Sequence, residues 1–317
     1  MYVQSQCSDR VDDAAHGIPV FWINLETSVE RRKYFSAQMQ RMGLRHKRIP
    51  GITPKSILTT EVKVDVVPRV EHTPKEISCV ISHLLAIREA VYDTTIGPKN
   101  PYALIMEDDV SFEMRVNFRE LAASVPEPFA GLQLMSSADN EMKRLWQDYK
   151  KNPVKSNLWE QRKLESFFWS AQAYLINKTA MRPLIDEVFT VKDGHSLTAA
   201  ANASGREYDH LRVRIISPPK AFPCPKNGKG GKCDFPMRLV SDTYIYAMCF
   251  PTFVTKVPMF NGAEVGGNTT IHMRKNNDVA HAKAFHEIAK LLAEVRTRPD
   301  LLPPHIQRKK CDAAAPK

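Results

Sequence analysis

The sequence predicts an α/β fold in which helices flank a mostly parallel central sheet. Short, apolar, β-rich segments such as Pro19–Leu25 and Tyr102–Met106 alternate with longer segments of helical periodicity, the pattern of successive strand–helix units. The composition, with 43% hydrophobic and 25% charged residues among 317, is typical of a globular protein with a buried core. It excludes collagen-like, coiled-coil and wholly disordered chains.

The first strand–helix unit lies near the start of the chain. The segment PVFWINL (Pro19–Leu25) predicts a buried strand. Ser28 is placed to cap the helix that follows, in which apolar residues recur at helical spacing to about Leu44. Gly43 marks its end. The polar, proline-containing stretch from Pro50 to Pro74 predicts a loop or lid.

The second unit begins with a capping-box sequence. Thr73-Pro74-Lys75-Glu76 combines an N-cap, a proline at the first helical position and a glutamate at the third, so a helix is expected to run to about Tyr92. The strand YALIM (Tyr102–Met106) follows. Further strands are predicted at Gly131–Met135, Phe167–Ile176, Leu211–Ile216 and Thr252–Val257, and further helices at Thr179–Phe189, Asp242–Cys249 and Asp278–Arg296.

The chain is expected to form a single domain over residues 19–296, with a half at about 19–135 and a second half at about 136–296. Residues 1–18 are expected to be an N-terminal extension, and residues 297–317 a loosely held tail of basic residues and prolines. The Pro/Gly/Lys-rich segment Ser217–Asp234 predicts an exposed loop.

The charge balance suits an anionic partner. Lys and Arg number 45 against 35 Asp and Glu, a net charge of +10. The basic residues form no dense stripe interleaved with aromatic residues, so nucleic acid is not the expected partner, whereas peripheral contact with an anionic membrane surface is compatible. We find no secretory signal and no apolar run that could span a bilayer. A cytoplasmic protein is expected, with a lumenal enzyme of the endoplasmic reticulum or Golgi as the alternative.

The sharpest chemical signal is an acidic triplet, Glu107-Asp108-Asp109, directly after the strand Tyr102–Met106. Open α/β sheets bind ligands at the carboxyl ends of their strands. Carboxylates this close repel each other unless a cation or basic side chains lie nearby. On extended backbone Glu107 and Asp109 would point to one side and Asp108 to the other. The triplet therefore predicts a divalent-cation site, against the alternative of a solvated acidic turn.

Other candidates are weaker. Ser82 and His83 lie on the helix that starts after Thr73, where a lone histidine is more often structural than catalytic. Cys224 and Cys233 could bind zinc, but no second Cys/His pair at metal spacing accompanies them, so a plain loop is favoured.

Several segments in their order along the chain resemble glycosyltransferase family 25, which includes lipopolysaccharide β-galactosyltransferases and procollagen galactosyltransferases. The resemblance spans roughly Pro19 to Phe260. Ser78 stands where family members usually have glycine. The segments are VFWINLETSVERR (Val20–Arg32), Pro50-Gly51, EISCVISHLLAIREAV (Glu76–Val91), YALIMEDDVSF (Tyr102–Phe112), FFWSAQAYLINKTAMRPLI (Phe167–Ile185) and VSDTYI (Val240–Ile245).

The resemblance implies a GT-A-type nucleotide-diphosphosugar transferase fold and an inverting transfer from a UDP-sugar, dependent on Mn²⁺ or Mg²⁺. It implies a glycan or glycoprotein acceptor and a role in glycan biosynthesis such as that of lipopolysaccharide. Galactose is the expected sugar, with glucose and xylose as alternatives. The half at 19–135 would bind the donor and the half at 136–296 the acceptor. Donor-binding residues by this resemblance are Asn24, Leu25, Arg31, Arg32, Ser82, His83, Glu107 and Asp108.

The metal ligands expected are Asp109, Glu107 and, from the C-terminal part of the domain, His272. Asp242, at the start of a helix, is expected to be the catalytic base, with Asp108 and Glu264 in reserve. Two other function classes stay open: a catalytically silent carbohydrate-binding or adhesion module, and a metal-dependent nuclease using the same acids. The intact triplet argues against the silent module.

Overall fold

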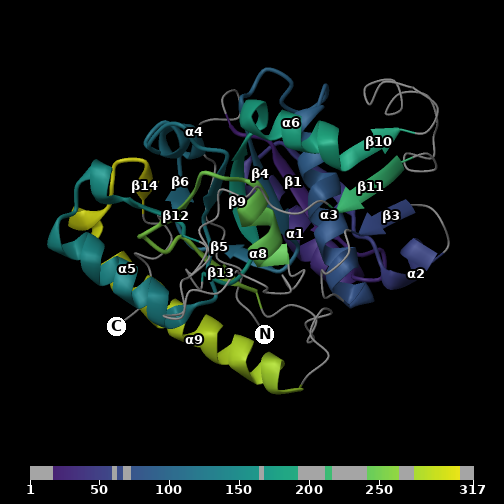
Figure 1. Ribbon diagram of the computed structural model, residues 1–317. Helices are drawn as coiled ribbons and strands as arrows, with labels where there is room; N and C mark the ends of the chain where they lie inside the picture. Colours follow the sequence, from purple (N-terminus) through teal and green to yellow (C-terminus); the bar gives the residue numbers. More distant parts are fainter. Residues whose placement is uncertain are drawn as a thin grey trace, which may run out of the picture.

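A seven-stranded sheet forms the centre of the molecule (Figure 1). The computed structural model describes residues 17–58, 63–66, 73–163, 168–191, 211–215, 241–263 and 275–307. In sheet order the strands are β2 (His46–Pro50), β1 (Val20–Asn24), β4 (Tyr102–Glu107), β9 (Ala173–Asn177), β7 (Gly131–Gln133), β12 (Thr252–Thr255) and β8 (Trp159–Gln161). Only β9 and β8 run antiparallel to the others. The predicted α/β class with a mostly parallel sheet is confirmed.

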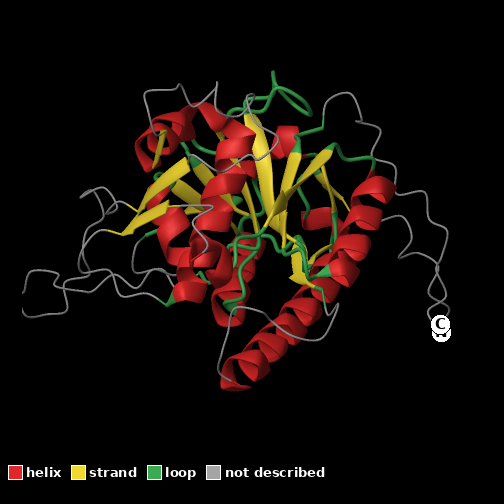
Figure 2. Ribbon diagram, turned by 90° about the vertical axis from the view of Figure 1, so that its right-hand side faces the viewer, coloured by secondary structure: helices red, strands yellow, loops and turns green. Residues whose placement is uncertain are grey.

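Helices cover both faces of the sheet (Figure 2). Alternating apolar residues build a core on each face. On β1, Val20 and Trp22 join one core, whereas Phe21 joins the other. The first face packs against helices α1 (Val29–Met42), α4 (Phe118–Ala122), α5 (Asp139–Lys151) and α9 (Lys275–Thr297). The second packs against α3 (Pro74–Val91), α6 (Lys178–Val188) and α8 (Ser241–Met248).

The structure tests the residues that were predicted to begin and end helices α1 and α3. Ser28 flanks α1 but makes no side-chain cap hydrogen bond, whereas Gly43 ends this helix in the left-handed conformation at φ 65°. In α3 the capping box is complete. The Thr73 hydroxyl accepts from the Glu76 amide (3.2 Å), and the Glu76 carboxylate accepts from the Thr73 amide (2.7 Å).

The stretch Pro50–Pro74 is not the plain loop that its composition predicts. It contains the short helix α2 (Pro54–Leu58) and the strand β3 (Lys63–Val66). β3 pairs with β11 (Leu211–Ile215), which pairs in turn with β10 (Phe189–Val191) in a separate three-stranded sheet. Such a strand is hard to recognise from sequence because its partner, β11, lies more than a hundred residues away.

The helix α5 was also missed, because its sequence is polar on average. Its apolar residues Met142, Leu145, Trp146 and Tyr149 nevertheless follow helical spacing, and all four are buried. Figure 1 shows α5 and α9 side by side, and Lys143 of α5 pairs with Glu287 of α9 (2.8 Å).

The expectation of a loosely held tail from residue 297 is wrong for its first part. A 3-10 turn spans Pro299–Leu301, and β14 (Ile306–Gln307) pairs with β6 (Arg115–Val116). Another two-stranded sheet joins β5 (Val110–Phe112) to β13 (Phe260–Gly262). This part of the chain packs on the domain because the apolar side chain of Ile306 is buried in the core, with 1% of its surface exposed.

Two further expectations concern the loop at Ser217–Asp234 and membrane-spanning helices. The segment Ser217–Asp234 lies outside the described residues. Within the described part of the chain, each helix is too short or too polar to cross a bilayer.

Candidate active site

The candidate site lies where the direction of the sheet connections reverses. β1 is followed by β2 on one side and, later, by β4 on the other, so the carboxyl ends of β1 and β4 form a topological switch point. Ligands of open α/β sheets bind at such points. Asn24 ends β1 and Glu107 ends β4. The acidic triplet is therefore placed where the fold class predicts a ligand.

Asp108 and Asp109 share one arginine. Arg31 of α1 lies 3.3 Å from a carboxylate oxygen of each. Asn24 donates a second hydrogen bond to Asp108 (2.6 Å), and Gln172 donates one to Asp109 (2.9 Å). The prediction that Asp108 points away from Asp109 is thus wrong. The strand ends at Glu107 and residues 108–109 form a turn, so strand alternation no longer applies.

Burial makes it costly for this pair to carry two negative charges. It raises the pKa of Asp108, against the opposing effects of Asn24 and Arg31. Burial also raises the pKa of Asp109 to about 7, and the charge of nearby Glu107 adds to the effect. Ionised, these carboxylates are incompletely neutralised by Arg31 alone. Hard oxygen donors with uncompensated charge suit a cation such as Mg²⁺ or Mn²⁺, so the donor set fits the predicted metal.

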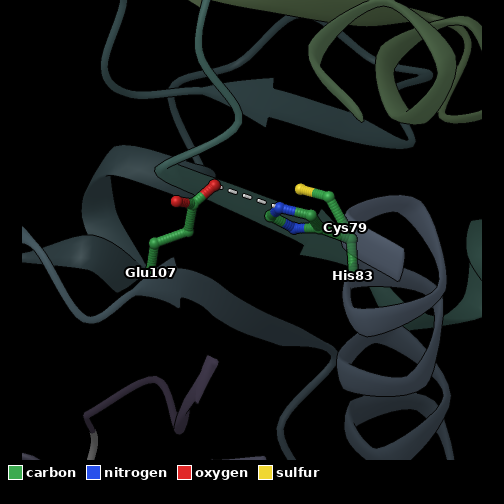
Figure 3. Close-up of side chains that lie close together, drawn as sticks. All are labelled: Cys79, His83 and Glu107. Carbon is green, nitrogen blue, oxygen red and sulfur yellow. Dashed lines mark hydrogen bonds and ion pairs between the residues drawn. The ribbon is translucent and has the colours of Figure 1, made fainter. Parts of the chain in front are cut away.

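Glu107 turns toward α3. Its Oε1 lies 3.2 Å from Nε2 of His83, and the other ring nitrogen, Nδ1, lies 3.0 Å from the hydroxyl of Tyr174 on β9. Cys79 lies one helical turn before His83 (Figure 3). Burial raises the pKa of the Cys79 thiol, and the charges of Glu107, Asp242 and Asp109 raise it further. The ligand atoms of Cys79, His83 and Glu107 lie within 4.8 Å of one another.

The two predicted arginines have different partners. Arg31 contacts the acidic pair, as described above. Arg32 donates to the side-chain oxygen of Asn24 (2.9 Å), to the main chain of Leu25 (3.4 Å) and to Glu26 (2.9 Å). Arg48 of β2 bonds the same Asn24 oxygen (2.9 Å). Arg32 and Arg48 thus fix the end of β1 and orient the amide that holds Asp108.

Ser82 is committed to internal contacts. Its hydroxyl accepts from the Ile52 amide (2.8 Å) and donates to the Ser78 carbonyl (2.7 Å). Ser82 therefore ties the loop after β2 to α3, beside the switch point. Its assignment to the donor stays a prediction.

Asp242 reaches the site from the start of α8. Its Oδ2 accepts from the Ser170 amide (3.1 Å). Its Oδ1 is buried and has no hydrogen-bond partner among the described residues. Ser170 adopts a φ of 93°, unusual for a residue with a side chain, and the hydroxyl of Tyr246 bonds its carbonyl (3.0 Å). A buried carboxylate oxygen without a protein partner is a place for a ligand's hydroxyl group.

Not every predicted residue can be placed. His272, Glu264, Cys224 and Cys233 lie outside the described residues. Conversely, Gln172, Tyr174 and Cys79 were missed as site residues. The i, i+4 spacing of Cys79 and His83 on a predicted helix was the available signal for Cys79. Gln172 and Tyr174 carried none, because they reach the site only through the pairing of β9 with β4.

Comparisons with known proteins bear on this site. No curated protein matches the chain. Among solved structures, the chain is similar to the crystal structure of mouse xyloside xylosyltransferase 1, apo form, at 15% identity and a TM-score of 0.29. That match covers 56% of this chain and 61% of the other, less than two thirds of its length. A likeness this weak assigns neither substrate nor reaction.

A family comparison is decisive. The model of glycosyltransferase family 25, described as an LPS biosynthesis protein, matches residues 18–197. This range holds β1, α3, β4 and β9, which supply Asn24, His83, the acidic triplet and Tyr174. It spans more than half of the 317 residues, so the chain belongs to glycosyltransferase family 25.

Proposed function

We propose that this enzyme transfers a sugar from a UDP-sugar to a hydroxyl group of a glycan or glycoprotein, with inversion at the anomeric carbon and dependence on Mn²⁺ or Mg²⁺. The observation that carries the proposal is the buried pair Asp108–Asp109 at the switch point, incompletely neutralised by Arg31. Galactose is the proposed sugar, with glucose and xylose as alternatives.

The proposed metal ligands are Asp109 and Glu107, with His272 as a third from sequence alone. When bound, the divalent cation would neutralise charge on the diphosphate leaving group. Arg31, at 11% side-chain exposure, keeps a positive charge beside the same carboxylates. Asn24 and Asp108, joined by a 2.6 Å hydrogen bond, are proposed to hold the nucleotide.

Asp242 is the proposed base. The acceptor hydroxyl oxygen would attack the anomeric carbon from the face opposite UDP, which leaves with the electron pair of the broken bond. The hydroxyl proton would pass to Oδ1 of Asp242, the buried oxygen without a described protein partner. The Ser170 amide would hold the other oxygen and so fix the carboxylate.

The enzyme is also proposed to work in a reducing compartment, the cytoplasm. The unpaired thiols of Cys79 and Cys249 support this proposal.

The test of function is a panel of UDP-sugars, each with and without Mn²⁺, scored for UDP release in the presence and absence of candidate acceptors. A transferase releases UDP from one donor only with the metal, and fastest with the correct acceptor. A silent module binds a sugar without turnover, and a nuclease ignores the panel. Either of the last two results would overturn the proposal.

The assignment of Asp109 is tested by Asp109→Asn. This change keeps the shape of the side chain and its position beside Gln172, but it removes the negative charge. Mn²⁺-dependent UDP-sugar binding should therefore weaken by at least about tenfold, as expected when a charged partner is lost. Binding is measured by calorimetry with and without Mn²⁺. Asp300→Asn, at an exposed carboxylate paired with Arg298, is the matched control and should bind like the parent. Equal binding by both variants would exclude Asp109 as a ligand.

A further inference from the structure

Three side chains of different chemistry converge in one cluster (Figure 3). Cys79 and His83 project from α3, one turn apart, and Glu107 faces them from the end of β4. Their Sγ, imidazole nitrogen and carboxylate oxygen all lie within 4.8 Å of one another. Within this cluster, a hydrogen bond joins the carboxylate of Glu107 to Nε2 of His83.

The donor set differs from that of the Asp108–Asp109 pair. A thiol sulfur and an imidazole nitrogen favour zinc and similar thiophilic cations, whereas Mg²⁺ and Mn²⁺ favour oxygen donors. Tetrahedral zinc, with bonds of about 2.0–2.3 Å, places its ligand atoms roughly 3.3–3.8 Å apart. Closing the cluster therefore requires side-chain shifts of about 1 Å, which rotation of the Cys79 and Glu107 side chains can supply.

The surroundings already orient the imidazole as a ligand. Metal-binding histidines usually hydrogen-bond a fixed partner through the second ring nitrogen. In His83 this nitrogen, Nδ1, lies 3.0 Å from the Tyr174 hydroxyl, and His83 is 1% exposed. When Nε2 faces a metal, the ring proton resides on Nδ1 and is donated to Tyr174. The ring need not move for this exchange.

The local charge also favours a cation. Glu107 supplies a carboxylate to the cluster itself, and Asp108 and Asp109 follow it directly in the chain. A divalent cation is attracted to carboxylates gathered in this way. Binding would release the thiol proton to solvent and leave the thiolate on the metal.

We propose that Cys79, His83 and Glu107 bind a thiophilic divalent cation, Zn²⁺, in a site separate from the oxygen-donor pair Asp108–Asp109. A water molecule would complete the coordination. Glu107 is the one residue that this site shares with the proposed Mn²⁺ or Mg²⁺ site, and the zinc site takes its Oε1, the oxygen that faces His83. The zinc site stands on its own geometry and does not require that the chain use a UDP-sugar.

The test is a metal titration of the purified full chain. Co²⁺ is the spectroscopic probe, because a thiolate on tetrahedral Co²⁺ gives a sulfur-to-metal charge-transfer band in the near ultraviolet and strong visible bands. Zn²⁺ should then displace Co²⁺ and abolish both. Calorimetry with Zn²⁺ should give one site that is lost in Cys79→Ala.

Two variants separate this site from other roles. Tyr174→Phe keeps the ring that packs on His83 (centroids 5.7 Å apart) but removes its hydroxyl, so Zn²⁺ should bind about 10–100-fold more weakly. Cys249→Ala removes a buried thiol that is not in the cluster and should leave the titration unchanged. The double variant Cys224→Ser/Cys233→Ser should also keep the band.

The outcomes are decisive. Loss of the charge-transfer band in Cys79→Ala, with weakened binding in Tyr174→Phe, supports the site. Three results would overturn the zinc site. The parent chain could show no charge-transfer band, the band could persist in Cys79→Ala, or it could be lost only in the Cys224/Cys233 variant. If Cys79→Ala does not fold, unchanged Zn²⁺ affinity in folded Tyr174→Phe overturns it instead. No arm measures sugar transfer, so failure here leaves the proposed function untouched, and the reverse is also true.

Discussion

At the residue scale, Asp242 has two oxygens in unequal environments. Oδ2 accepts from the Ser170 amide, whereas Oδ1 is buried without a partner among the described residues. A buried carboxylate oxygen left in this state costs free energy, which a purely structural role would not require. These unequal environments suit a general base, because the hydrogen bond to one oxygen fixes the carboxylate while the other oxygen can receive a proton.

Asp242→Asn should therefore lower kcat by about 10²–10⁴-fold, the usual contribution of a general base. UDP-sugar affinity should stay near the parental value, because the base acts on the acceptor. Steady-state kinetics and donor calorimetry measure the two quantities, and thermal unfolding checks that the variant is folded. Near-parental turnover, or a variant that merely unfolds, would leave Asp242 with the structural contact to Ser170 alone.

The same residues show how far sequence reasoning reaches. The triplet Glu107-Asp108-Asp109 and the arginine Arg31 are recognisable because they are next to predicted elements, and the structure joins them. Gln172 and Tyr174 are not, since their contacts with Asp109 and His83 cross 63 and 91 residues. Periodicity gives the strand around Tyr174 but not its neighbour in the sheet.

At the element scale, α3 carries Cys79, Ser82 and His83 and depends on its first turn. The capping box satisfies two amides, those of Thr73 and Glu76. Thr73→Ala should lower the free energy of unfolding by about 1 kcal/mol, within the 0.5–2 kcal/mol range for such caps. Urea unfolding measures the change. Thr27→Ala, at an exposed turn outside any helix, is the control, and an equal loss in both variants would contradict the capping argument.

The pairing of β1 with β2 brings His46 beside Trp22, whose indole N–H donates to Nδ1 of His46 (3.1 Å). Burial lowers the pKa of His46, since the neutral ring is favoured in the folded state. On acidification the unfolded state then binds the proton first, at its ordinary pKa of 6.5. The stabilisation from His46 is thus complete above pH 6.5 and is lost as the pH falls below it toward the folded-state pKa.

His46→Gln should remove this part of the pH dependence. Between pH 7.5 and pH 5, the parent should lose more unfolding free energy than the variant, because only the parent carries a group whose unfolded state binds the proton first. Urea titrations at several pH values give the difference, in which the other titrating groups cancel. Parallel pH profiles would show that His46 does not contribute.

The ends of helices and strands can be predicted from sequence only where a few neighbouring residues mark them. Thr73–Glu76 and Gly43 mark helix ends by chemistry confined to a few residues, and both were correctly predicted. The strands β2 and β3 lack such a signal. His46–Pro50 contains three basic or histidine side chains and only one fully buried residue, Ile49, so neither its hydropathy nor its alternation indicates a strand. Its strand form comes from pairing with β1.

At the scale of the whole molecule, strand order decides where the site lies. The α/β class follows from the alternation of strand-like and helical segments, but the order β2-β1-β4-β9 does not, and it is this order that makes the switch point. Strands from both predicted halves of the domain share the sheet, with β9 between β4 and β7. The site is therefore assembled across the halves rather than contained in the first.

The final segment of the described chain belongs to this assembly. β14 pairs with β6, the Tyr149 hydroxyl of α5 donates to the Leu301 carbonyl (3.1 Å), and Ile306 is 1% exposed within the same core as Trp22 and Met106. The turn 299–301 and β14 thus close the face of the sheet that α5 and α9 cover.

Ile306→Ala should consequently cost about 2–5 kcal/mol of unfolding free energy, the range for truncating a buried isoleucine, because a core with fixed neighbours relaxes only partly around the cavity. Gln307→Ala, at the exposed next position of the same strand, should cost less than about 0.5 kcal/mol. Urea unfolding of both variants measures the contrast. Equal, small losses would mean that the segment after Thr297 contributes little to folding, as its basic, proline-containing sequence suggests; a large loss at Ile306 alone shows that one apolar side chain in such a sequence is enough to make it part of the fold.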